Sequence, residues 1–238
     1  MKRVSSTPAR SYGGVSATDR KLERRRRLTD AALDVMAADE WRSATVEQIC
    51  SSAGLNKRYF YQGFADLDEL ASAVVDDIAD EVRDATLAAF AQVADQPLER
   101  QALASVDALV RGLVRDPRRA RVLLGGVAAT PSLRRHREQV LSGLTSVLTR
   151  QARVVHGVEL ERDPLAQIAP AFVVGGTAEA ILSYLDGSAR ITLDQLVTEL
   201  TTLWLVTGNG AAEVARARLG HSARSESGSD VRDQHRNG

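Results

Sequence analysis

The chain has 238 residues, of which 44% are hydrophobic and 4% aromatic, and its formal net charge is zero. This apolar content is enough for a core in one or two domains, and the single cysteine excludes an intrachain disulfide scaffold and fits a reducing compartment. The N-terminus is polar where a signal peptide would be apolar, and the longest apolar run, residues 122–129, is far shorter than the ~20 residues of a membrane span. We therefore expect a soluble cytoplasmic protein that does not enter a membrane.

Positive charge is concentrated in the first quarter of the chain. Residues 1–62 contain 12 Lys and Arg against 7 Asp and Glu, whereas the remaining 176 residues contain 19 against 24. Residues 1–18 are expected to form a flexible arm, and four consecutive arginines at 24–27 lie at the start of the first expected helix. Such a cluster can contact the phosphates of a nucleic acid, although a solvated basic arm has the same composition.

Residues 45–64 have the pattern of two short helices separated by a tight turn. Thr45 can cap a helix that runs to about residue 53, Gly54 suits the turn, and Asn56 can cap the second helix. Phe60 and Phe64 are four residues apart, so both should point into the core. Two capped helices this close together predict a helix-turn-helix, a unit with which many proteins read DNA.

The opposite face of the second helix has side chains that suit DNA. Because each helical residue turns by ~100°, Arg58 and Gln62 lie opposite the two phenylalanines. Tyr59 and Tyr61 flank them, and Lys57 lies near the helix N-terminus. Arginine can bond guanine and glutamine can bond adenine through paired hydrogen bonds, while lysine and tyrosine can reach phosphate. The alternative is an ordinary solvated face, since these residue types are common on surfaces.

The order of residues across three expected helices is more specific than any single feature. The segment AGLNKRYFYQGF at 53–64 is followed by Leu70, and the segment DEWRSATV at 39–46 follows an apolar stripe in the first helix, formed by Leu28, Ala32, Val35 and Met36. This order closely resembles the signature of the tetracycline-repressor (TetR) family over about residues 20–75. Two departures are Leu67, where the family usually has a phosphate-contacting lysine, and Gly63, where it often has His or Tyr.

The resemblance implies an all-α fold in two parts. It places an N-terminal three-helix helix-turn-helix DNA-binding domain at 19–65 and a C-terminal helical domain for effector binding and dimerisation at 66–207, before a mostly disordered tail at 208–238. It also implies a homodimeric repressor that binds double-stranded DNA at a near-palindromic operator and is released by a small-molecule effector. The expected DNA contacts are Arg25, Thr45, Gln48, Asn56, Lys57, Arg58, Tyr59, Tyr61 and Gln62.

Beyond residue 65 the sequence predicts a series of amphipathic helices. A long helix from Asp66 to about residue 94 continues from the DNA-binding domain, and a second helix ends at Asp116-Pro117. A short helix follows, and a longer one runs from Pro131 to near Gly157. The aliphatic middle helices favour a pocket for an apolar or amphipathic effector. Its expected lining is Leu103, Val106, Val110, Leu113, Leu141, Leu144, Phe172 and Thr177.

The last two expected helices, at 163–185 and from 193 to about 207, are apolar on more than one side. In TetR-like proteins the corresponding helices pair with their copies in a four-helix dimer interface. A fully internal helix pair in a monomer is the alternative. The residues expected at the dimer interface are Phe172, Val173, Gly176, Ile181, Leu200 and Trp204.

No motif indicates catalysis or the binding of a metal or cofactor. The four histidines are scattered, and the glycine pairs at 125–126 and 175–176 lie outside phosphate-binding patterns. Cys50 is expected to be a buried core residue rather than a redox sensor. We therefore expect no enzyme, no cofactor and no metal. A helical hydrolase and a constitutive or architectural DNA-binding protein without an effector are the alternatives.

Overall fold

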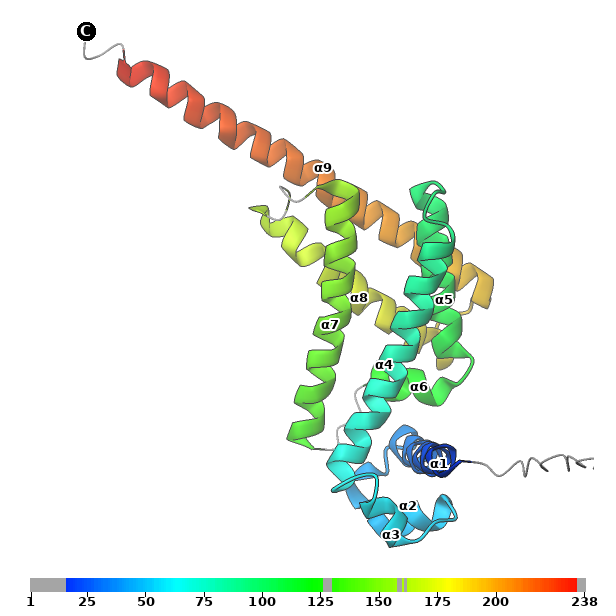
Figure 1. The fold of residues 1–238 in the computed structure, drawn as a ribbon. Helices are drawn as coiled ribbons and strands as arrows, with labels where there is room; N and C mark the ends of the chain where they lie inside the picture. The colour runs from blue at the N-terminus through cyan, green and yellow to red at the C-terminus, as the bar shows by residue number, and fades with distance from the viewer. Residues whose placement is uncertain (1–15, 126–129, 158–159, 161, 235–238) are drawn as a thin grey trace, which may run out of the picture.

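The computed structural model describes residues 16–125, 130–157, 160 and 162–234, and all the regular secondary structure of these residues is helical. The predicted all-α fold class is therefore confirmed for this part of the chain. Figure 1 shows the N-terminal helices at one end, which we call the head, and a larger body formed by the helices that follow. The helix α4 (Leu67–Gln92) leads from the head into the body.

The head consists of α1 (Ala17–Ala37), the short 3-10 helix η1 (Trp41–Ser43), α2 (Val46–Ser52) and α3 (Lys57–Tyr61). The first helix begins within the predicted arm because Ser16 and Asp19 form a capping box. The Ser16 hydroxyl accepts from the Asp19 N–H at 3.0 Å, and the Asp19 carboxylate accepts from the Ser16 N–H at 3.2 Å. The arginines at 24–27 therefore lie inside α1 rather than at its start. The rest of the predicted arm, residues 1–15, lies outside the described residues.

The body comprises α4, α5 (Leu98–Val114), α6 (Pro117–Leu123), α7 (Pro131–His156), α8 (Pro164–Leu185) and α9 (Leu193–Gln234). Three of these helices have proline in the first turn and an Asp or Thr cap just before it: Asp116, Thr130 and Asp163. Proline needs no hydrogen-bond partner there, and the cap accepts from an otherwise unpaired N–H. These signals explain why the helix starts agree with the sequence-based expectation.

One hydrophobic core runs through both head and body. In the head it contains Leu28, Ile49 and Phe60, which are 0–1% exposed, and in the body it contains Val106 and Val110 at 0%. The two ends are joined by α4, whose buried face extends over residues 70–82 and packs on α1 at one end and on α5 at the other. A displacement of α4 therefore changes packing contacts in both the head and the body.

The C-terminal helix differs from the expectation that residues 208–238 are mostly disordered. It continues without interruption to Gln234 and projects away from the other helices in Figure 1. Residues 211–219 are mostly strong helix formers, and Ala212 and Ala215 are buried against Leu160. Arg218 also lies 3.3 Å from the buried carboxylate of Asp163. Packing against the body thus extends a helix whose glycines at 208 and 210 suggested an end.

One helix of the described chain, α8, is long and apolar enough to cross a membrane by length and composition alone, with a mean hydropathy of 1.5. Polar residues such as Gln167 and Glu179 interrupt its apolar sequence, so α8 contains no long uninterrupted apolar run. A single helix of this kind is weak evidence for a membrane, since core helices of soluble proteins pass the same test.

Candidate DNA-binding surface and ligand cavities

The first helix of the helix-turn-helix is fixed by a reciprocal cap. The Thr45 hydroxyl accepts from the Gln48 N–H at 3.2 Å, and the Gln48 side-chain oxygen accepts from the Thr45 N–H at 2.9 Å. Asn56 caps α3 in the same way, because its side-chain oxygen accepts from the Tyr59 N–H at 3.1 Å. All three cap residues are exposed, so they hold the helix starts while facing solvent.

The turn between α2 and α3 depends on Gly54. Its φ is +61°, a conformation that favours glycine, and the following Leu55 N–H donates to the Cys50 carbonyl at 2.8 Å. The Arg27 guanidinium of α1 donates to the Gly54 carbonyl at 3.3 Å. A Cβ at Gly54 would lie 2.6 Å from that same Arg27 nitrogen. The turn is therefore tied directly to α1.

The orientation of α3 agrees with its sequence phase. Phe60 is 0% exposed and Phe64 is 2% exposed, with their ring centroids 6.0 Å apart, so these rings anchor the inner face. The expected DNA-contacting residues of α3 and its C-terminal end are all exposed: Lys57, Arg58, Tyr59, Tyr61 and Gln62. The structure thus brings together a continuous polar and aromatic surface on one side of the head.

Arginines of α1 border this surface in a way that the sequence did not reveal. The Arg24 guanidinium lies over the Tyr59 ring at 4.7 Å, and the Arg25 guanidinium lies over the Phe64 ring at the same distance. Burial raises the pKa of Asp77, and the nearby charge of Arg25 opposes this shift. Arg25, predicted as a phosphate contact, thus also packs on the head core. Sequence spacing alone gave no signal for these stacked pairs.

Two positions near α3 bear on phosphate binding. The Lys57 ammonium pairs with the Glu47 carboxylate at 3.0 Å, and this hydrogen bond raises the pKa of Lys57. Both partners are exposed, so the pair is weak and Lys57 can exchange Glu47 for a phosphate. Leu67, which replaces the usual lysine of the TetR family, is half-buried and packs on the core. This departure from the expected lysine therefore places an apolar side chain against the core.

The body contains two neighbouring apolar cavities. The inner cavity, about 140 Å³, lies among α4 to α9, and the outer cavity, about 170 Å³, lies near the C-terminal end of α7. Four of the predicted pocket residues line the inner cavity: Leu113, Leu141, Leu144 and Thr177.

The other four predicted pocket residues lie elsewhere. Val106 and Val110 are fully buried in the core, Leu103 borders an open groove beside α9, and Phe172 is 68% exposed. The helical period of α5 identified its buried stripe correctly. It could not distinguish the part of that stripe that packs on neighbouring helices from the part that faces an empty space.

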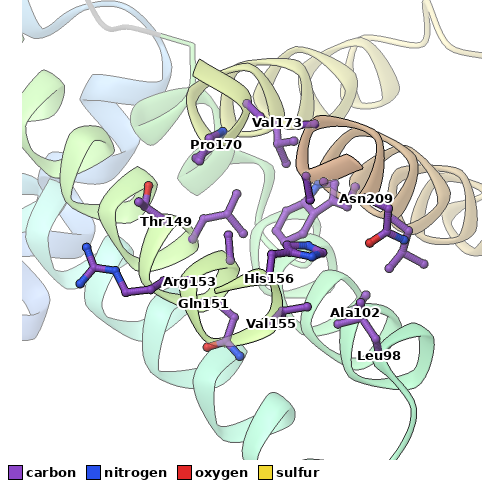
Figure 2. A pocket seen from close by; sticks show the side chains of 18 of the residues that line it. Leu98, Ala102, Thr149, Gln151, Arg153, Val155, His156, Pro170, Val173 and Asn209 are labelled. Atoms are coloured by element: carbon purple, nitrogen blue, oxygen red, sulfur yellow. The ribbon is translucent and has the colours of Figure 1, made fainter. Parts of the chain in front are cut away.

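The outer cavity was missed by the sequence analysis. Figure 2 shows His156 from α7 and Asn209 from α9 facing the same space, while the Arg153 side chain extends away from it. Burial lowers the pKa of His156, with a further contribution from the charge of Arg216, so the imidazole is neutral at neutral pH. The outer cavity depends on the extension of α9 beyond residue 207, where the glycines at 208 and 210 had indicated a helix end.

The outer faces of α8 and α9 require a correction of the predicted dimer interface. Ile181 and Leu200 are 1% and 3% exposed, because they belong to the subunit core. Val173 lines the outer cavity, and the Trp204 indole N–H donates to the Thr177 hydroxyl at 2.7 Å beside both cavities. From the predicted set only Phe172 and Gly176 are exposed. A helix that is apolar on several sides does not reveal which side is left uncovered.

Other apolar residues of α8 and α9 are exposed instead. They are Ile168 at 62%, Phe172 at 68%, Leu203 at 58% and Val206 at 65%, and we call them the α8–α9 face. The two helices pack directly against one another. Ile168 and Phe172 are four residues apart on α8, and Leu203 and Val206 are three apart on α9, so each pair shares one side of its own helix. An apolar group of this kind is typical of a protein–protein interface.

Cys50 and the ionisable residues give no sign of redox or metal chemistry in the part of the chain that is described. Cys50 is 3% exposed, and burial raises the pKa of its thiol, which therefore stays protonated and poorly reactive. Among the described residues there is no group of three or more His, Cys, Asp or Glu placed to hold a metal ion.

Comparison with known proteins gives a consistent result at the level of fold. No family model matches the chain, and no curated protein matches it in sequence. Among solved structures, the fatty acid degradation regulator FadR from Bacillus halodurans has a TM-score of 0.63 at 19% identity, covering 76% of this chain and 94% of its own. A TetR-family transcriptional regulator from Syntrophomonas wolfei has a TM-score of 0.66 at 11% identity, covering 79% and 95%.

A third similar structure was solved with a ligand. FadR from Bacillus subtilis in complex with stearoyl-CoA has a TM-score of 0.60 at 15% identity and covers 76% of this chain and 98% of its own. All three similarities cover at least three quarters of this chain and 94% or more of the other chain. The helix-turn-helix signature and the arrangement of the helices therefore agree, and the chain has the fold of the TetR-family transcriptional regulators.

Proposed function

We propose that the protein is a TetR-family transcriptional regulator that binds DNA through α3 and responds to a small-molecule effector in the cytoplasm. The observation that carries this proposal is the exposed surface of Arg58, Tyr59, Tyr61 and Gln62 on a helix anchored from behind by buried Phe60. A rigidly held helix with such side chains fits the major groove.

Within that surface the residues divide by role. Arg58 and Gln62 read base edges, since their side chains are exposed and can form paired hydrogen bonds with guanine and adenine. Phosphate contacts come from Lys57, the tyrosine hydroxyls, the α2 cap residues Thr45 and Gln48, Asn56, and the arginines of α1. The head thus combines base recognition with contacts that fix its position on the duplex.

The regulator acts as a homodimer joined through the α8–α9 face. Its exposed apolar residues would remain in water in a monomer, and a symmetric pairing of two such helix pairs buries them. Two heads related by a twofold axis then reach successive major grooves about 34–36 Å apart, which requires a near-palindromic operator.

The effector binds in the two cavities of the body. Their lining is mostly aliphatic and aromatic, which suits an apolar or amphipathic molecule. The similar B. subtilis FadR binds stearoyl-CoA, so the fold accommodates an acyl ligand. Effector binding releases the operator, and the protein is then a repressor.

The walls of the cavities are connected to the head by polar contacts as well as by α4. Leu123 and Leu124 at the end of α6 line the inner cavity, and Arg118 at the start of α6 pairs with Asp34 at 2.7 Å and Asp30 at 3.2 Å on α1. A ligand that moves α6 therefore also moves α1. This gives the effector a route to the spacing of the two heads.

Selection of bound fragments from random DNA tests the proposal. A regulator enriches one near-palindromic sequence, which the purified protein then binds at least about 10³-fold more tightly than random DNA at one fixed salt concentration. A constitutive architectural DNA-binding protein would bind all duplexes within a few-fold. Absence of DNA binding by a folded dimer would reject both functions.

A further inference from the structure

The two cavities of the body are best understood as two compartments of one site. Small-molecule pockets usually enclose roughly 300–1,000 Å³. The cavities measure about 170 and 140 Å³, so each alone falls short of this range and the two together reach its lower end. They also share five lining residues, namely Phe90, Ser105, Leu148, Gln151 and Trp204. A ligand of ordinary size must therefore extend across both.

The partition between the compartments is formed by side chains that can move. Trp204 borders both cavities and is held by its hydrogen bond to Thr177, which lines the inner one. Phe90 of α4 also borders both. Rotation about their side-chain bonds needs no change in the helix backbone, so these two rings can make way for a ligand that passes between the compartments. Because Phe90 belongs to α4, a ligand that passes it also contacts the helix that leads to the head.

Polar groups are distributed unequally between the compartments. Most of the residues that line the inner cavity are Leu, Val, Ile or Ala. Four of its polar side chains are already bonded to other residues of the protein, namely Arg83, Thr86, Ser105 and Thr177. The outer cavity adds His156 and Asn209, whose side chains face the same space in Figure 2. His156 is half-buried and Asn209 is exposed, and neither side chain bonds another described residue, so this end can offer hydrogen bonds to a ligand.

We propose that the effector is a single-chain amphiphile whose aliphatic chain passes the Phe90–Trp204 partition into the inner cavity, while its polar head group bonds His156 and Asn209 in the outer cavity. This proposal rests on the proposed function, because it specifies the effector of the same site. A flexible chain can extend from one compartment into the other past the residues that line both. Chain length is then recognised by the depth of the inner cavity.

Straight-chain carboxylic acids of increasing length are the probes. Trp204 borders both compartments, and the only other tryptophan, Trp41, is buried in the head. In a Trp41→Phe background, the emission of Trp204 therefore reports binding directly, and calorimetry on the unaltered protein provides a second measurement. The affinity should rise about fourfold with each added methylene until the inner cavity is full, and then level off.

Two alanine positions give matched variants, with melting curves used to confirm folding. Ala178→Leu narrows the inner cavity and should move the plateau to chains about three methylenes shorter, while the shortest chains that bind keep their affinity. Ala102→Leu narrows the outer cavity and should weaken all chain lengths alike. His156→Leu removes a head-group partner and should weaken the carboxylic acids about 3- to 10-fold at every length.

The outcomes separate this proposal from the proposed function. If no acid changes the Trp204 emission or produces heat, or if Ala178→Leu weakens every length equally, the two-compartment assignment is wrong. Selective DNA binding would still support the regulator. If the protein bound the acids in a chain-length-dependent way but bound no DNA, the two-compartment site would stand and the proposed function as a regulator would be rejected.

Discussion

Arg58 is the side chain on which base recognition depends most directly, because it is exposed and forms no hydrogen bond or ion pair with the described residues. Arg58→Ala should lower the affinity for the selected operator by about 1–3 kcal/mol and relax specificity at one base pair in each half-site. Titration of the operator and of operators substituted at each position measures both effects. Unchanged affinity would show that α3 does not present this residue to the bases.

Lys57 supplies the matched control on the same helix. Its ammonium pairs with exposed Glu47 rather than with a buried group, so its loss should leave the fold unchanged. Lys57→Ala should weaken all DNA sequences alike and reduce the slope of log affinity against log salt by about one. If Lys57→Ala changed base preference, the division between base-reading and phosphate-binding residues would be wrong.

Gly54 is the residue on which the shape of the turn depends. Gly54→Ala should destabilise the protein by about 1–2 kcal/mol, because φ is +61° and the new Cβ would displace the Arg27 guanidinium. Gly63→Ala is the control, since its added Cβ would meet the nearest atom at 3.6 Å, an ordinary contact. Chemical denaturation of both variants measures the difference. Equal stabilities would mean that the turn can relax at no cost.

At the scale of the helices, the sequence was most informative where local signals decide the structure. The caps Thr45 and Asn56, and the prolines at 117, 131 and 164, mark helix starts through contacts within the first turn. The exposed face of α3 was likewise predictable, since two phenylalanines fix its rotation. Such signals depend only on residues close together in the chain.

The same reasoning failed where the environment of a helix is set by distant segments. Ile181 and Leu200 proved to be core residues and Val173 a cavity residue, although all three were expected at a dimer interface. In a helix that is apolar on several sides, the residue types do not say which side meets a neighbour, an empty space or solvent. The prediction that the last helix ends near residue 207 failed for the same reason, since Ala215 packs on Leu160 from another part of the chain.

The contact between α6 and α1 gives a prediction at this scale. Arg118 lies between Asp30, Asp34 and Asp116, and hydrogen bonds with Asp116 and Asp34 raise its pKa, so it stays charged at all ordinary pH values. Arg118→Ala should reduce the coupling between effector and operator by about 0.5–2 kcal/mol. Operator affinity measured with and without effector gives this quantity directly.

Arg115→Ala provides a control for the loss of positive charge, because Arg115 is exposed at the end of α5. It should leave the coupling unchanged. Arg118→Lys should lie between the unaltered protein and Arg118→Ala, since lysine keeps the charge but cannot bond several carboxylates as a planar fork does. Full coupling in Arg118→Ala would mean that α4 alone connects the cavities to the head.

For the whole molecule, assembly depends on the α8–α9 face. Phe172→Glu should give folded monomers that lose operator binding, because association would bury an unpaired charge. Val154→Glu is the control, since Val154 is 79% exposed on α7 and lies outside this face. Sedimentation at micromolar concentration should show a dimer for the unaltered protein and for Val154→Glu. A monomeric unaltered protein would contradict the proposed interface.

Val173→Glu does not serve as this test, because Val173 lines the outer cavity rather than the free face of α8. A charge there should weaken effector binding and leave the dimer intact. The contrast between positions 172 and 173 separates the two functions of α8. The side of α8 that carries Val173 lines the ligand site, and the side that carries Phe172 belongs to the α8–α9 face.

Coupling between effector and operator is a property of the whole molecule, and α4 gives this coupling a physical basis. The buried face of α4 contacts α1 in the head, and the α4 side chains Val82 and Phe90 line the cavities. Effector should lower operator affinity by a coupling of about 1–3 kcal/mol, and by linkage a saturating operator must lower effector affinity by the same factor. The emission of Trp204 measures the second quantity, and DNA titration measures the first. Unequal factors would show that the two titrations did not measure one closed equilibrium among the same species, for example because the dimer dissociates. If neither factor differed from one for any compound that binds the cavities, the protein would be a constitutive DNA binder.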